Sequence, residues 1–465
     1  MFNFLKSNTI DKDKIAKLLQ TTPEILAEFE KAYQKQVLSD NTPSDNFFEI
    51  NAKQAAESHA GFSNTDCPQL HDIMMRIVDE LVAQTPIWEF DGTRSKATEI
   101  SVALPDKCVT LEEITNLPKE LQPELSGNLM KRDINEPSYI MLLDMYQHYH
   151  TEKNPTKRQG FYHRFRQGLD ILDLDPITYE IIGMNPNSMG YWLPRIADAT
   201  IEHSFFKIPK TTIIKVPLTL LQLTRQPYEN LTRTTLDIVD KFCQKVFKLD
   251  TEKEYFIKTG TYSSKFDFRN AHIWTPHEVL ELGEYLLFIH YQALMMASPL
   301  SSPCIYGVST TNEWVVREFI QDKELNPTIY KGLPLHTEYR VFVDFNTKQV
   351  IGINPYWDPA IMKERFLRDA ENDNHCKHDY ITYTANEERL MKRYNENKDM
   401  ISSKLQELIS DIDGLSGQWS IDIMQNDTDF WLIDMHLAQN SAYYEECVPE
   451  ELRVPLEENW LPKIG

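Results

Sequence analysis

The sequence predicts an α+β fold, in which a two-lobed module of antiparallel sheets and helices follows an α/β or mostly helical N-terminal region. From about residue 211, short segments rich in β-branched and aromatic residues alternate with longer segments of helical periodicity. Several of the short segments are paired across a few polar residues, as in hairpins. Hairpins separated by helices are typical of antiparallel sheets with helices packed on them.

The 465 residues are enough for several domains, each with its own core. The expected divisions are an N-terminal helical segment over 1–45, an acceptor-side domain over 46–217, a first lobe over 218–318 and a second lobe over 319–465. The helical pattern of Asp11–Gln36 could dock a partner protein, although packing onto the body of the protein is the simpler interpretation. The polar stretch Ser39–Asp45 is interpreted as a linker.

The patterns predict the individual elements in order along the chain. In the N-terminal region they are helices at His71–Ala83 and Ser138–Tyr149 and strands at Ile87–Phe90 and Ser101–Leu104. In the C-terminal half the strands are Thr211–Val216, Tyr255–Lys258, Trp314–Ile320, Tyr339–Asp344, Val350–Asn354, Trp419–Met424 and Phe430–Met435. The helical stretches between them are Leu218–Lys248, Glu278–Met296 and Glu387–Ile409.

The charge balance argues against two classes of partner. With 70 acidic and 48 basic side chains the net charge is −22, which repels phosphate backbones and anionic membranes. We therefore expect no nucleic-acid and no membrane partner. The chain lacks an apolar run of the roughly 20 residues that span a bilayer, and its N-terminus lacks the features of a signal peptide. The six cysteines show no framework spacing, so reduced thiols in a cytoplasmic protein are expected.

The first candidate site segment is a strand that ends in a lysine and continues into a small, hydroxyl-rich loop. Lys258 closes the strand, and Gly260, Ser263, Ser264 and Lys265 follow. A fixed cation beside exposed backbone N–H groups suits a triphosphate, and Lys265 could reach its terminal phosphate. The loop is not a Walker A motif, and an ordinary hairpin turn is the alternative interpretation.

The second segment is the strand Glu313–Ile320 with the polar residues that follow it. Its apolar residues could line a slot for adenine beside Arg317, with backbone groups around Glu318 and Ile320 reading the base edge. Glu324 lies where a carboxylate could accept both ribose hydroxyls. A surface strand with flanking charges is the alternative interpretation.

Two further segments place charged side chains on apolar strands. Glu338 and Arg340 share one face of their strand, from which an arginine can clamp a phosphate, although a cross-strand ion pair is the alternative. Asp422 and Asp434 each interrupt an apolar strand of one predicted hairpin. Buried carboxylates are costly unless they are paired or bind a metal, so these two are candidate Mg²⁺ ligands, with Asn440 as a neutral oxygen donor.

Two polar segments have less specific patterns. Asn185–Arg195 is interpreted as a loop that could cap a substrate carboxylate, with a structural loop equally open. The sequence His375-Cys376-Lys377-His378 lies in a region expected to be a charged surface loop, and its spacing does not suit a structural metal site.

Taken in order, the four segments resemble those of the ATP-grasp superfamily over about residues 207–444. The resemblance implies that the two-lobed module is an ATP-grasp module. Phe206–Lys215 is similar to the strand that often precedes it, which places Lys215 near the nucleotide. By the same resemblance Lys258 binds phosphate, Glu318 and Ile320 the adenine edge, Glu324 the ribose, Arg340 a phosphate, and Asp422 and Asp434 Mg²⁺. Glu338–Val343 and Leu432–Met435 are also reminiscent of cell-division-type members that assemble a translation factor.

The resemblance implies an ATP-dependent ligase that uses ATP and Mg²⁺. Such an enzyme phosphorylates a carboxylate, on a small molecule or a peptide, and an amine then attacks the acyl-phosphate; Lys258, Lys265 and Arg340 would be the catalytic residues. The alternatives are an ATP-binding assembly factor without ligation and a phosphotransferase. Many family members carry Glu-x-Asn on the last metal-binding strand, whereas this chain has Asp434-Met435-His436. In this chain the role of the asparagine in that pattern would be taken by His436 or by Asn440, or no residue would take it.

Overall fold

The structure, a computed structural model, is built around two sheets and describes residues 68–98, 109–123, 182–226, 228–297, 311–369 and 374–454, with short stretches between 148 and 179. The segments predicted at Asp11–Gln36, Ser39–Asp45 and Ser101–Leu104 lie outside the described residues, as does all of Ser138–Tyr149 except His148. The described part combines antiparallel sheets with helices, which confirms the predicted α+β class.

The first sheet has six strands in the order β2-β1-β4-β7-β5-β6, and every neighbouring pair is antiparallel. Its strands are β1 (Ile87–Phe90), β2 (Ser95–Thr98), β4 (Thr211–Lys215), β5 (Tyr255–Thr259), β6 (His272–Ile273) and β7 (Glu313–Glu318). Because side chains alternate along a strand, one face of β7 presents Trp314 and Val316 and the other presents Val315 and Arg317. The two faces therefore have different roles.

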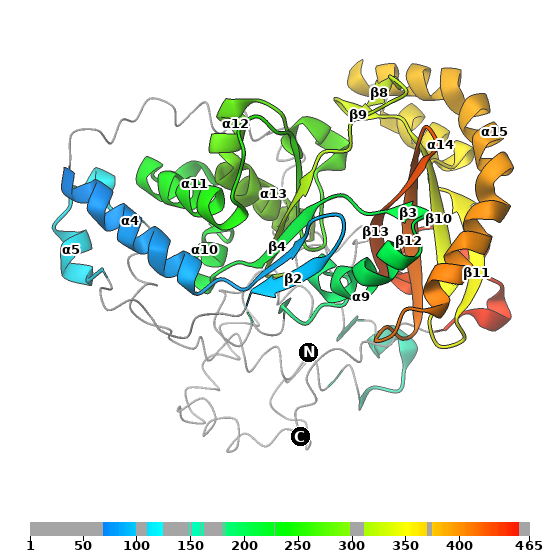
Figure 1. Ribbon diagram of the computed structural model, residues 1–465, viewed down its shortest axis with the longest axis horizontal. Coiled ribbons are helices and arrows are strands. Elements are labelled where there is room, and N and C mark those ends of the chain that lie inside the picture. Colours follow the sequence, from blue (N-terminus) through cyan, green and yellow to red (C-terminus); the bar gives the residue numbers. More distant parts are fainter. Residues whose placement is uncertain are drawn as a thin grey trace.

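The face that carries Trp314 and Val316 is covered by helices, which bury it in a large apolar core (Figure 1). These helices are α4 (Pro68–Ala83), α5 (Leu111–Thr115), α10 (Leu218–Leu223), α11 (Arg233–Phe247), α12 (Pro276–Leu280) and α13 (Leu282–Ala297). The predicted helix Leu218–Lys248 is two helices with a 3-10 turn at Tyr228–Asn230 (η3) between them. The second begins at Arg233, after Thr232, whose side chain accepts a hydrogen bond from the Thr235 N–H and so caps the helix.

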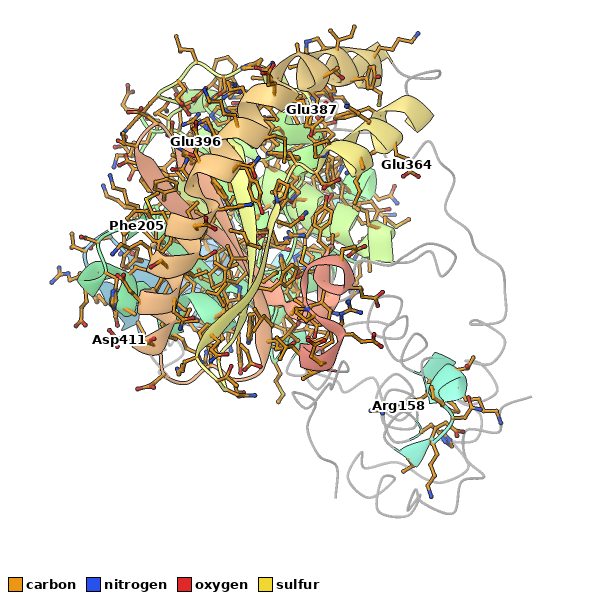
Figure 2. All side chains as sticks on the ribbon, turned by 90° about the vertical axis from the view of Figure 1, so that its right-hand side faces the viewer. Arg158, Phe205, Glu364, Glu387, Glu396 and Asp411 are labelled. Atoms are coloured by element: carbon orange, nitrogen blue, oxygen red, sulfur yellow. The ribbon has the colours of Figure 1, made fainter. Side chains whose placement is uncertain are left out.

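The second sheet has five strands in the order β11-β10-β12-β13-β3, all antiparallel except the β13–β3 pair. Its strands are β3 (Phe206–Lys207), β10 (Thr337–Asp344), β11 (Gln349–Pro355), β12 (Gln418–Asn426) and β13 (Asp429–Leu437). Helix α15 (Asn374–Ser410) lies lengthwise along it, with Glu387 and Glu396 on its course, and α14 (Pro359–Asp369) packs beside α15 (Figure 2).

Smaller elements complete the described part. They are the two-stranded sheet of β8 (Thr328–Ile329) and β9 (Leu333–Pro334), helix α16 (Tyr444–Cys447), and the 3-10 segments η2 (Lys119–Leu121), η4 (Lys265–Asn270), η5 (Ala438–Asn440) and η6 (Glu450–Leu452).

Helix α9 (Met189–Glu202) packs against strands of both sheets and joins them. Met189, Trp192, Leu193 and Ile196 are fully buried, in a core shared with β4, β7, β10, β12 and β13. The prediction of a polar loop over Asn185–Arg195 was therefore wrong from Met189 onward. The apolar residues recur at helical spacing, and this signal outweighs the polar appearance of the segment.

The segment His375–His378 lies in the first turns of α15, so the prediction of a surface loop there was also wrong. Its charged residues are compatible with a helix that begins at Asn374, because a helix can expose one polar face. Among the described residues, no group of three or more His, Cys, Asp and Glu side chains is arranged to hold a metal ion. Within the same residues, no helix is long and apolar enough to cross a membrane, and Cys243 and Cys447 are free thiols.

Candidate functional site

A cleft lies between the two sheets, and four of the predicted segments meet in it. We call it the inter-sheet cleft. It is bounded by β5 with its loop, β7 and the residues after it, β10, and the β12–β13 hairpin. Of the predicted site residues, the following line it: Lys258, Ser263, Lys265, Arg317, Glu318, Ile320, Asp422 and Asp434. Segments that are far apart in the sequence therefore contribute to one site.

Strand register explains why Lys258 and Arg317 share a face. Lys258 pairs with Val315, and Phe256 pairs with Arg317, on the antiparallel strands β5 and β7. Paired residues lie on the same face, and so do residues two apart along a strand. Both cations therefore project from the face opposite the helix-covered core and toward the second sheet. Lys258 is almost fully buried there.

Lys258 forms an ion pair with Asp434 of β13. Its Nζ lies 3.0 Å from Asp434 Oδ2 and 3.1 Å from Oδ1, and His436 Nε2 lies 3.4 Å from Oδ2. Burial acts to raise the pKa of Asp434, but the charges of Lys258 and His436 more than offset it, so the pKa lies well below its usual range. Asp434 is therefore ionised at neutral pH.

Arg340 forms a second ion pair, with Asp422. Its Nε and Nη2 each donate to one carboxylate oxygen at 2.8 Å, a bidentate arrangement on the paired positions of β10 and β12. The guanidinium also lies over the ring of Tyr356, 4.7 Å from its centroid. Burial acts to lower the pKa of Arg340, and Asp422 reverses this and raises it. Asp422 and Asp434 are themselves paired across the β12–β13 hairpin, so both carboxylates stand side by side.

Arg317 differs from the other cations because most of its hydrogen-bonding capacity is unused. The side chain is buried, and its Nη1 donates to the Ile433 carbonyl at 2.7 Å. Its Nε and Nη2 are buried and find no partner among the described residues. Burial lowers the pKa of Arg317 to about 10, so it is charged at neutral pH. A buried donor without a partner is costly, so these two N–H groups are available to an anion that enters the cleft.

Lys265, Glu318 and Glu338 are further ionisable groups that line the cleft. The Nζ of Lys265 donates to the Tyr356 hydroxyl and lies 4.5 Å from the centroid of that ring. Burial lowers the pKa of Lys265. Burial also raises the pKa of Glu338 to about 8, although Lys265 partly offsets the effect. Glu338 is therefore mainly protonated at pH 7, which removes one negative charge from the cleft.

The remaining walls of the cleft are apolar and partly aromatic. They are formed by Phe256, Phe268, Phe319, Met424 and Ile433, with Leu333 and Pro334 of β9 at one edge. Such walls suit a planar, weakly polar group, whereas the cations suit an attached anion. The combination fits a phosphorylated aromatic ligand such as a nucleotide.

Several predicted site residues lie elsewhere. Lys215 is at the exposed far end of β4, opposite Glu313. The Gly260 N–H donates to the Glu313 carbonyl at 3.0 Å. An added Cβ at Gly260 would lie only 2.1 Å from Ser188 Oγ, so glycine is required there for close packing. Ser264 is buried and donates to Gln292 at 3.1 Å.

Glu324 and Asn440 also make contacts outside the cleft. One Glu324 oxygen accepts from Arg393 Nη1 at 2.7 Å. The Asn440 side-chain oxygen accepts from Asn187 Nδ2 at 3.1 Å, and Asn187 in turn accepts from the Leu437 N–H. Asn440 thus holds the segment before α9, and His436 is the side chain beside Asp434.

Tyr356 is a cleft residue that the sequence patterns missed. It touches both Lys265 and Arg340 with its ring, and its hydroxyl accepts from Lys265. The one available signal was that Tyr356 directly follows β11, which forms a hairpin with β10. In that hairpin Pro355 is opposite Tyr339. Glu338 was placed on the correct strand face, but the burial that raises its pKa depends on segments distant in sequence and was not predicted.

Comparisons with known proteins give only weak structural likenesses. No protein-family model matches the sequence, and no curated protein matches it. A solved structure of C-terminally truncated Cdc123 from Schizosaccharomyces pombe is similar at 15% identity and a TM-score of 0.32, over 60% of this chain and 95% of that chain. A structure titled Cdc123 from the same organism is similar at 16% identity and 0.32, over 58% and 93%. A TM-score this low assigns neither fold nor function to the chain.

Proposed function

We propose that the inter-sheet cleft binds Mg·ATP. The observation that carries this proposal is Arg317, a buried guanidinium with two N–H groups unpartnered among the described residues, on a strand face that also presents Lys258. A cleft with three cationic side chains and apolar walls fits a nucleotide better than a neutral ligand or a simple inorganic anion.

Each residue has a distinct part in this proposal. Lys258, Lys265 and Arg317 would bind phosphate oxygens, and the apolar walls beside Phe319 and Ile320 would hold the base. Asp422 and Asp434 would hold Mg²⁺, which favours oxygen ligands and is commonly bound through one or two carboxylates together with substrate phosphates. The ion would supply charge neutralisation on the phosphates. The two adjacent carboxylates are enough for an ion that also binds substrate phosphates. A metal site made of protein ligands alone needs more ligands.

We further propose ATP-dependent ligation as the reaction class. A carboxylate oxygen of the substrate would attack the γ-phosphorus, ADP would leave, and an amine would then displace phosphate from the acyl-phosphate. The chain's contribution is to position the reactants and to balance charge with Lys258, Lys265 and Arg340. Arg340 takes part only if it is shared between Asp422 and the ligand, because both of its contacts to Asp422 are already made.

One observation favours a second candidate, an ATP-binding assembly factor without ligation. His436 is the side chain beside Asp434, and Asn440 is committed to Asn187, so neither supplies the neutral oxygen of the Glu-x-Asn pattern. A cleft with only two carboxylates for metal could hold Mg·ATP and still be a poor catalyst.

Isothermal titration calorimetry with Mg·ATP tests the binding proposal. Wild type should bind at one site, and Arg317→Met should weaken binding by about 10- to 100-fold, since hydrogen bonds to charged groups are worth about 1.5–3 kcal/mol. Arg94→Met is the matched control, because that side chain is exposed and pairs only with Asp91 among the described residues. Equal affinity for wild type and Arg317→Met would overturn the proposal.

Product analysis separates the reaction classes. Wild-type protein is incubated with Mg·ATP and a panel of carboxylates, each with and without hydroxylamine as a general amine acceptor. A ligase releases ADP and phosphate only with a carboxylate and forms a hydroxamate. A phosphotransferase gives ADP without free phosphate, and an assembly factor binds ATP without turnover. Hydroxamate formation that persists in Lys258→Ala would contradict the role given to Lys258.

A further inference from the structure

A basic groove lies beside the inter-sheet cleft, on the other side of the residues that follow β7. It consists of two adjoining hollows that share Phe90, Lys210 and Glu318. We call it the lysine groove. The first hollow also shares Pro209, Phe319 and Ile320 with the inter-sheet cleft. The groove thus adjoins the inter-sheet cleft and shares one wall with it.

The charge of the groove is opposite to that of the whole chain. Among the described residues, its walls carry seven basic side chains, which are Arg94, Lys96, Lys207, Lys210, Lys248, Lys253 and Lys323. They carry three acidic side chains, Glu89, Asp91 and Glu318. The chain as a whole has 48 basic and 70 acidic side chains, so a random patch would be acidic. A concentration of positive charge in a concave surface attracts anionic partners.

The floor of the first hollow is apolar. Ile201 is exposed, and Phe319, Ile320 and Trp431 are half-buried there. The Nζ of Lys207 lies 5.7 Å from the centre of the Trp431 ring, so this lysine stands at the edge of the apolar floor. Cationic walls above an apolar floor match a ligand that carries both carboxylates and apolar side chains.

The pairing of the lysines favours a polypeptide over a nucleic acid. Lys207 and Lys323 both lie 2.7 Å from Asp429, Lys210 lies 3.2 Å from Glu318, and Lys248 lies 3.0 Å from Glu89. These interspersed carboxylates would repel a continuous row of phosphates. A polypeptide can place its own charges so that they avoid these carboxylates. Lys96 and Lys253 form no ion pair with a described residue, so no such pair would compete with a bound segment.

We propose that the lysine groove is a docking surface for an acidic segment of a partner protein that also carries aliphatic or aromatic residues. The segment's carboxylates would pair with Lys96, Lys207 and Lys253, and its apolar side chains would cover the floor near Trp431. This inference does not require nucleotide in the neighbouring cleft.

Fluorescence anisotropy tests the proposal with a labelled peptide of about 12 residues in which aspartate and glutamate alternate with leucine and phenylalanine. Wild type should bind it, and Lys96→Glu/Lys207→Glu/Lys253→Glu should bind it at least about tenfold more weakly. The matched control is Lys377→Glu/Lys392→Glu/Lys404→Glu, which makes the same charge change on α15, at the outer edge of the second sheet (Figure 1). It should bind as wild type does.

Circular dichroism should show that each variant is folded. If charge reversal unfolds the protein, the corresponding glutamine variant is used, and it should also weaken binding. Failure of wild type to bind the peptide would overturn the proposal, as would equal losses in the groove and α15 variants. Tighter binding of a single-stranded oligonucleotide than of the peptide would overturn the choice of a polypeptide.

Discussion

Lys258 of β5 and Asp434 of β13 form an ion pair that connects the two sheets across the cleft, with Nζ 3.0 Å from Oδ2. A group that we propose binds a phosphate and a group that we propose binds Mg²⁺ therefore neutralise each other. The Arg340–Asp422 pair, within the second sheet, likewise joins a cation to a carboxylate. Binding of Mg·ATP would exchange these partners, because the carboxylates would turn to the metal and the cations to the phosphates.

The exchange of partners predicts that Asp434→Asn raises the affinity for ATP in the absence of Mg²⁺ but hardly in its presence. Without the metal, the variant should bind ATP more tightly than wild type by roughly tenfold, because Lys258 is released and an anion is removed. With Mg²⁺ present, the variant should bind ATP little more tightly than wild type does. Calorimetry in EDTA and in Mg²⁺ measures both. Asp411→Asn, a change of the same charge at an exposed position after α15, should behave as wild type in both buffers. Weaker metal-free binding by Asp434→Asn would refute the exchange.

Arg317→Met should make the protein more stable while it weakens nucleotide binding. The substitution removes a buried charge with two donors that are unpartnered among the described residues, at the loss of one hydrogen bond to Ile433. We expect the free energy of unfolding in urea to rise by about 1–3 kcal/mol. A marked loss of stability would show that Arg317 has structural partners and is not held ready for a ligand.

The Arg340–Asp422 pair should be strongly coupled in stability. Removing one member, as in Arg340→Met or Asp422→Leu, leaves the other charge buried without its partner and should cost about 3–5 kcal/mol. Arg340→Met/Asp422→Leu removes both charges and should recover most of that loss. Urea denaturation of the two single variants and the double variant measures the coupling. If the loss in stability of the double variant equals the sum of the losses of the single variants, the two side chains do not form the ion pair seen in the structure.

Glu338 should make stability depend on pH near neutrality. Its pKa in the folded protein is about 8, against an ordinary value of 4.5, so the folded state keeps a proton that the unfolded chain releases. The contribution is fully present below pH 4.5 and is lost as pH rises through about 8. Relative to wild type, Glu338→Gln should therefore gain melting temperature progressively from pH 5 to pH 8.5. A constant difference across that range would exclude the raised pKa.

The strands and the hairpins were predictable because their signals are local. The predicted strand Trp419–Met424 lies within β12 and Phe430–Met435 within β13, and the turn between them is short enough to bring Asp422 opposite Asp434. Alternation along single strands likewise put Glu338 and Arg340 on one face.

Contacts between distant segments were not predictable from the sequence. Nothing near Asn440 in the chain indicates that it would bond to Asn187 rather than face a metal. Likewise, Gly260 has the setting of a phosphate loop, but its lack of a side chain is needed for packing against Ser188, which lies in another segment. Such contacts depend on how α9 joins the two sheets, which no single segment encodes.

A crystal structure with Mg²⁺ and a non-hydrolysable ATP analogue tests the central claim most directly. We expect the analogue in the inter-sheet cleft, with a phosphate oxygen within hydrogen-bonding distance of Arg317 Nη2, Mg²⁺ on Asp422 and Asp434, and Lys258 turned from Asp434 to the phosphates. An analogue bound elsewhere, or a cleft that stays empty at saturating concentration with the Lys258–Asp434 pair intact, would contradict the account.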